Sequence, residues 1–120
     1  MQQLYARYNH AIHVGDGALW ANCFTLSATF SNTRESVTGR TALAAYATEF
    51  SKGRRARYWI NNLLLEPRGS HAQGSCYLLI LHIAAAGDTA SIQLTGVYTD
   101  AIARTEHGWL FETRHVAADR

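Results

Sequence analysis

The sequence GVYTDAIARTEHGWLFETR, at residues 96–114, decides the fold. It reads as the adjoining parts of two strands, approximately 89–104 and 108–117, joined by a turn at His107-Gly108. Two more segments with strand patterns precede it, at 57–66 and 74–86. They are followed by turn signals at Pro67-Arg68-Gly69 and Gly87-Asp88, respectively. The second half of the chain is therefore predicted to be an antiparallel meander.

The first half of the chain is mainly helical. Residues 2–14 place apolar side chains at helical spacing, Gly15 is a natural stop, and Asp16 can cap a short second helix. A third helix is predicted within residues 39–53, and one or two short strands within 28–38. Helices first and long strands afterwards predict an α+β fold rather than α/β.

Length and composition favour one globular domain over residues 1–120. The chain is 48% hydrophobic and 17% charged, and its formal net charge is only +2. The one dense basic run, residues 52–57, is too short to form a continuous phosphate-binding surface, so no nucleic acid partner is expected.

The N-terminus is polar, and no run approaches the ~20 apolar residues of a membrane span, so we expect a cytoplasmic protein without a membrane partner. Cys23 and Cys76 lack C-x-x-C spacing and are predicted to be reduced packing residues.

The predicted strand at 74–86 is apolar on both faces. In CYLLILHI, residues 76–83, both the even and the odd positions carry apolar side chains. An antiparallel sheet normally exposes one face to water. We therefore expect helices on one face and a second copy of the chain on the outer face, as a homodimer.

Several stretches resemble the SnoaL-like branch of the NTF2-like superfamily over nearly the whole chain. They are YNHAIHVGDGALWANCF, GRTALAAY, RYWINNLLLE and the ending marked by Tyr98, Asp100, Arg104, Gly108-Trp109 and Arg114. The resemblance implies a cone-shaped fold, with three N-terminal helices packed on a strongly curved, mixed, mostly antiparallel sheet around an apolar pocket. Members of the superfamily include scytalone dehydratase, ketosteroid isomerases and polyketide cyclases, so the fold alone does not define the activity.

The resemblance also implies site residues. Tyr8 matches the tyrosine with which ketosteroid isomerase donates to a developing enolate oxygen, but Asn32 stands where that enzyme has its general base. His13 stands where scytalone dehydratase relatives carry a pocket-facing aspartate, and Tyr58 replaces their strand histidine. Standard steroid isomerisation is therefore disfavoured, whereas a histidine at this position can exchange protons near neutral pH.

We predict that His13 shuttles a proton, that Tyr8 and Tyr58 donate hydrogen bonds, and that Asn32 orients the substrate. The other predicted substrate-binding residues are Tyr46, Asn62, His82, Tyr98 and Trp109. Several of these residues have an alternative, purely structural interpretation. Tyr8 is then a tyrosine packed in the core, and His13 is a histidine that stabilises the C-terminal end of its helix. No metal and no cofactor is expected, because the histidines lack metal-binding spacing.

Two further features of the charged residues each allow two interpretations. Asp100 and Arg104 share a strand face and are interpreted as a sheet salt bridge or as support for a pocket side chain. The basic run at 52–57 is either a solvated turn or, near the mouth of the cone, a means of steering an anionic substrate.

The predicted function is cofactor-independent acid/base chemistry on a small hydrophobic cyclic molecule: dehydration, isomerisation or cyclisation. This enzyme hypothesis requires a cavity of about 300 Å³ or more with convergent polar groups. The alternative is a non-catalytic binding or assembly module, similar to the small subunits of aromatic-ring dioxygenases. In that case aromatic side chains fill the cone.

Overall fold

The computed structural model describes residues 1–119. Its elements occur in the predicted order: α1 (Gln2–Val14), α2 (Gly17–Ala21), β1 (Phe24–Ser31), β2 (Ser36–Thr38), α3 (Arg40–Ser51), β3 (Ala56–Arg68), β4 (His71–Ile83), β5 (Ala90–Thr105) and β6 (Gly108–Ala118). Most bounds lie close to the prediction, but β1 begins at Phe24, four residues before the predicted segment. The meander and the α+β class are confirmed.

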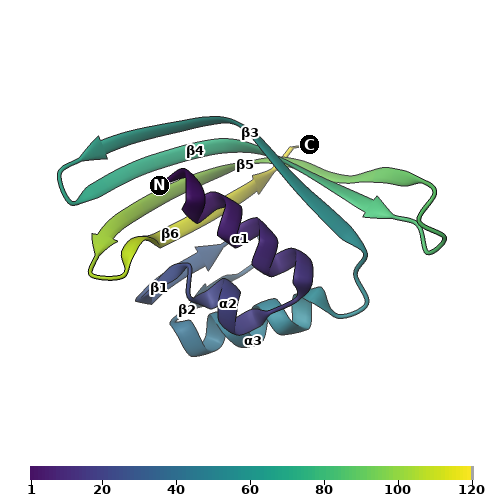
Figure 1. Cartoon of the computed structure of the whole chain (residues 1–120), viewed down its shortest axis with the longest axis horizontal. Coiled ribbons are helices and arrows are strands. Elements are labelled where there is room, and N and C mark those ends of the chain that lie inside the picture. The colour runs from purple at the N-terminus through teal and green to yellow at the C-terminus, as the bar shows by residue number, and fades with distance from the viewer. Residues whose placement is uncertain (120) are drawn as a thin grey trace.

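The strands form one curved sheet in the order β2-β1-β6-β5-β4-β3. The β1–β6 pair is parallel and the other pairs are antiparallel, so the sheet is mixed and mostly antiparallel as expected. The sheet is not closed into a barrel, because β2 and β3 remain as its edges. The helices lie together on one side of the sheet, and α1 crosses in front of the long strands (Figure 1).

Local signals explain how α1 ends. Gly15 has a left-handed backbone (φ 75°), and the chain then turns into α2. The Asp16 carboxylate caps α2 by accepting a hydrogen bond of 2.9 Å from the amide of Leu19. This turn places the C-terminal end of α1 beside α3.

An aromatic cluster fills much of the space between the helices and the sheet. Tyr8 of α1 lies 5.4 Å from Trp20, 5.9 Å from Tyr98 and 5.8 Å from Phe111, measured between ring centroids. All four side chains are buried. The interior of the cone is therefore largely closed by its own side chains.

Both cysteines are buried free thiols, as predicted. Burial raises the pKa of Cys23 and of Cys76 to about 11, which keeps both groups protonated at neutral pH. Within residues 1–119, no helix is long and apolar enough to cross a membrane.

Candidate active site

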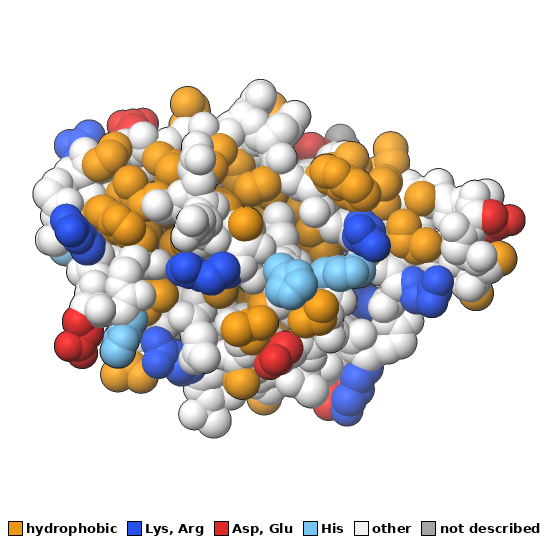
Figure 2. Space-filling model, in the orientation of Figure 1, with side chains coloured by type: hydrophobic (Ala, Val, Ile, Leu, Met, Phe, Trp, Pro, Cys, Tyr) orange, Lys and Arg blue, Asp and Glu red, His pale blue; other side chains and the backbone are white. Residues whose placement is uncertain are grey.

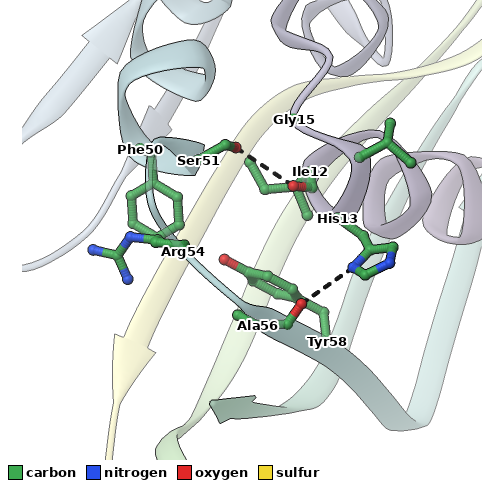
Figure 3. A pocket seen from close by; sticks show the side chains of 9 residues that line it. Ile12, His13, Gly15, Phe50, Ser51, Arg54, Ala56 and Tyr58 are labelled. Carbon is green, nitrogen blue, oxygen red and sulfur yellow. Dashed lines mark hydrogen bonds between the residues drawn. The ribbon is translucent and has the colours of Figure 1, made fainter. Parts of the chain in front are cut away.

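A small cleft opens where the C-terminal ends of α1 and α3 meet the start of β3 (Figure 3). Its volume is about 180 Å³, smaller than expected for the enzyme hypothesis. Its lining combines apolar, hydroxyl and basic side chains: Ile12, His13, Val14, Gly15, Phe50, Ser51, Arg54, Ala56 and Tyr58. Two of the three predicted catalytic residues, His13 and Tyr58, thus share one cleft.

The His13 ring is held at the rim of the cleft by a backbone contact. Its Nδ1 lies 3.2 Å from the carbonyl oxygen of Ala56 (Figure 3). A carbonyl oxygen only accepts hydrogen bonds, so Nδ1 carries the hydrogen in the neutral ring and Nε2 keeps its lone pair. The side chain is exposed, so Nε2 is accessible as a proton acceptor.

The Tyr58 side chain is half-buried in the cleft, with its hydroxyl end directed towards Phe50 and Arg54 (Figure 3). Burial raises the pKa of Tyr58, while Arg54 lowers it more weakly. The hydroxyl is therefore a hydrogen-bond donor, and not a base, at neutral pH.

The Arg54 side chain provides a permanent positive charge at the same cleft. Its guanidinium carbon lies 3.9 Å from the centroid of the Phe50 ring, which is a cation–π contact. No salt bridge to Arg54 occurs among residues 1–119.

Tyr8 lies deeper, in the aromatic cluster, and does not line the cleft. Burial raises the pKa of Tyr8 and so does the neighbouring Tyr98, while the positive charge of Arg114 opposes the rise. Tyr98 is buried beside Tyr8.

The remaining predicted binding residues are dispersed. Tyr46 is half-buried on α3, stacked on Phe50 at 5.8 Å, and therefore lies behind the cleft wall. His82 is exposed and pairs in register with Ala56, next to the rim. Trp109 is half-buried and pairs with Arg104 near the β5–β6 turn, at the opposite end of the sheet.

Both predicted asparagines lie at irregular backbone. The Asn32 amide oxygen accepts hydrogen bonds from the backbone amides of Arg34 (2.8 Å) and Glu35 (3.0 Å), so it closes the β1–β2 turn. Asn62 is exposed with φ 53° at an irregularity in the β3–β4 register. Neither residue lines the cleft.

A buried ionic cluster, which no sequence pattern predicted, lies on the inner face of the sheet. Arg114 Nε lies 3.2 Å from Asp100 Oδ1, and both side chains are fully buried. The Tyr5 hydroxyl donates a hydrogen bond of 2.6 Å to Asp100 Oδ2. The predicted partnership of Asp100 with Arg104 is wrong, because Arg104 is exposed and Arg114 takes its place.

Aromatic rings surround the Arg114 guanidinium. Its carbon lies 3.4 Å from the ring centroid of Tyr98, 4.2 Å from Tyr8 and 4.5 Å from Phe111. Burial raises the pKa of Asp100, and the positive charge of Arg114 opposes that rise. The cluster ties α1 to β5 and β6.

No group of three or more His, Cys, Asp or Glu side chains suited to a metal ion occurs in residues 1–119. The candidate site combines three side-chain groups: a proton acceptor at His13, a hydrogen-bond donor at Tyr58 and a cation at Arg54.

Comparisons with known proteins agree with this fold. A protein of unknown function from Mycobacterium tuberculosis is 33% identical, with a TM-score of 0.92 over 99% of this chain and 69% of that one. A protein from Catenulispora acidiphila, solved in complex with S-DNPA, is 26% identical, with a TM-score of 0.85 over 98% and 90% of the two chains.

An NTF2-like protein with a cystatin-like fold from Novosphingobium aromaticivorans is 17% identical, with a TM-score of 0.87 over 97% and 77% of the two chains. No curated protein matches the chain. The model of the SnoaL-like domain matches residues 1–115, and the chain therefore belongs to the SnoaL-like family, with an NTF2-like fold.

Proposed function

We propose that this protein is a cofactor-independent enzyme that moves protons on a small hydrophobic cyclic molecule, in a dehydration, isomerisation or cyclisation. The observation that carries the proposal is the cleft shared by His13, with its free Nε2, and the donor hydroxyl of Tyr58. The ligand-bound relative from Catenulispora acidiphila supports a ligand-binding role for the fold.

The chemistry assigns separate roles to the two groups. The Nε2 lone pair of His13 takes a proton from a carbon next to the substrate carbonyl. The electron pair moves to the carbonyl oxygen, which accepts a stronger hydrogen bond from Tyr58 as its negative charge grows. The His13 imidazolium then returns the proton to a different atom of the substrate, so the enzyme ends unchanged.

Deuterium exchange into cyclohexanone in D₂O, followed by NMR, tests this proton transfer without knowledge of the natural substrate. We expect exchange above the buffer rate, and a reduction of roughly 100-fold in His13→Gln and in Tyr58→Phe. His10→Gln is the matched control, because His10 is exposed on the same helix but does not line the cleft. Exchange that is equal in wild type and both cleft variants would contradict the proposal.

The aromatic closure of the cone favours a second candidate, a non-catalytic binding or assembly module. The rings of Tyr8, Trp20 and Phe111 occupy space in which a large pocket would otherwise lie. This candidate predicts that the wild-type protein gives no exchange above the buffer rate while small cyclic ligands still bind.

We also propose a homodimer through the outer face of the sheet. Trp59, Tyr77 and Ile92 are 50%, 53% and 69% exposed. The β3–β4 register pairs Trp59 with Leu79 and Asn61 with Tyr77, and the β4–β5 register pairs Leu81 with Ile92. The three exposed side chains therefore share the outer face. Apolar side chains of this size, gathered on one face, are typical of a protein interface.

Sedimentation equilibrium checks the dimer. We expect a dimer for the wild type and a monomer for Tyr77→Glu, because the variant places an unpaired charge within the apolar face. Leu26→Glu, at a residue 74% exposed on β1, is the control and is expected to remain dimeric. A wild-type protein that is monomeric at all concentrations would refute this proposal.

A further inference from the structure

The cleft carries positive charge without any compensating acidic group. Arg54 is the one permanently charged residue of its lining, His13 adds a second positive charge when protonated, and no Asp or Glu is among the lining residues. The adjacent segment adds Arg55, and β3 adds Arg57 at its start, whereas Lys52 of the turn is already paired with Glu49 at 2.7 Å. On the face seen in Figure 2, Lys, Arg and His side chains gather around the region where α1 ends and β3 begins.

The Arg54 guanidinium is positioned to bind a ligand. Its carbon lies 3.9 Å from the centroid of the Phe50 ring, and no salt bridge of its N–H groups occurs among residues 1–119. A planar guanidinium donates two parallel hydrogen bonds to a carboxylate, and a side chain that already contacts an aromatic ring loses less entropy on binding. The hydroxyl end of Tyr58 points to the same place (Figure 3).

The remaining walls suit a hydrophobic ring. Ile12 and Val14 of α1 and the Phe50 ring of α3 provide apolar surface, and His13 lies across the cleft at the end of α1. The volume of about 180 Å³ is that of a site for one small ring with a short substituent.

We propose that the cleft binds a monocyclic compound that bears a carboxylate or a similarly acidic oxygen, with the anionic group on Arg54 and the ring between Ile12 and Phe50. As a statement about substrate class, the inference rests on the proposed function. When the acidic group of the ligand binds Arg54, the opposite end of the ligand contacts His13.

Calorimetric titration with benzoate and with its neutral isostere benzamide tests the inference on the intact chain. We expect benzoate to bind at least about tenfold more tightly than benzamide, because a charge-assisted bidentate contact is lost in the amide. Arg54→Gln is expected to abolish this preference and to leave benzamide affinity unchanged. Arg55→Gln is the matched control, since this neighbour carries the same charge but does not line the cleft, and it is expected to retain the preference.

Two results would overturn the inference: equal affinity of the wild type for benzoate and benzamide, or an equal loss of benzoate binding in the Arg54 and Arg55 variants. The second result would mean that diffuse surface charge, and not a site, attracts the anion. The cyclohexanone exchange assay separates this failure from failure of the proposed function. Cyclohexanone carries no acidic group, so its exchange reports on His13 and Tyr58: wild-type exchange without a preference for benzoate overturns this inference alone, whereas absence of wild-type exchange overturns the proposed function.

Discussion

Asp100→Ala is expected to lower the free energy of unfolding by about 3–5 kcal/mol, measured by urea denaturation followed by circular dichroism. The carboxylate is the only salt-bridge partner of Arg114 among residues 1–119, and it also accepts the Tyr5 hydroxyl. Without it, a guanidinium that is 1% exposed keeps its charge inside an aromatic cage with no counter-ion. A buried unpaired charge of this kind costs far more than the lost contact itself.

Two further variants identify the cause of the loss. Arg114→Met combined with Asp100→Ala removes both charges, and we expect it to recover much of the stability, since buried ion pairs are often replaced by apolar groups at little cost. Glu112→Ala removes a half-exposed partner of His71 at 3.6 Å and is expected to change stability by less than about 0.5 kcal/mol. If Asp100→Ala costs no more than Glu112→Ala, the cluster has no special role in stability.

The position of Arg114 explains why this pair was not predicted. At the β5–β6 turn, Thr105 pairs with Gly108, and an unbroken register would place Asp100 opposite Thr113. The register shifts between Ala101 and Ile102, and Asp100 instead pairs with Arg114. One extra residue turns the following side chains to the other face of a strand, and no sequence pattern in this hairpin marks that bulge.

Local chemistry made other features predictable. The left-handed glycine at Gly15 and the capping carboxylate at Asp16 depend on neighbouring residues only, and both were identified from the sequence. The cleft depends on contacts between distant segments: His13 meets Ala56 across 43 positions of sequence. The family resemblance indicated His13 and Tyr58, but the place of Phe50 and Arg54 beside them appears only when the end of α3 is packed against the end of α1 and the start of β3.

Gly17, the first residue of α2, lies directly against the backbone of α3. A Cβ atom at this position would clash with the carbonyl oxygen of Ala44 and with Thr48 Oγ1. The same carbonyl accepts the Thr48 hydroxyl at 3.0 Å within α3. The backbone contact cannot be relieved by a side-chain rotation, so the helices α2 and α3 must separate to admit a methyl group.

Gly17→Ala is therefore expected to reduce the free energy of unfolding by about 3 kcal/mol, although alanine is the better helix former by about 1 kcal/mol. Thermal and urea unfolding measure the change. Gly69→Ala is the control, because Gly69 has φ 64° but no atom within 4 Å of an added Cβ, so only backbone strain of roughly 1 kcal/mol is expected there. Adding Thr48→Ala to Gly17→Ala removes one of the two close contacts and is expected to restore only part of the loss, since the Ala44 carbonyl stays in place. Full recovery in that double variant would assign the clash to the threonine hydroxyl alone and show that the α2–α3 backbone approach tolerates a methyl group.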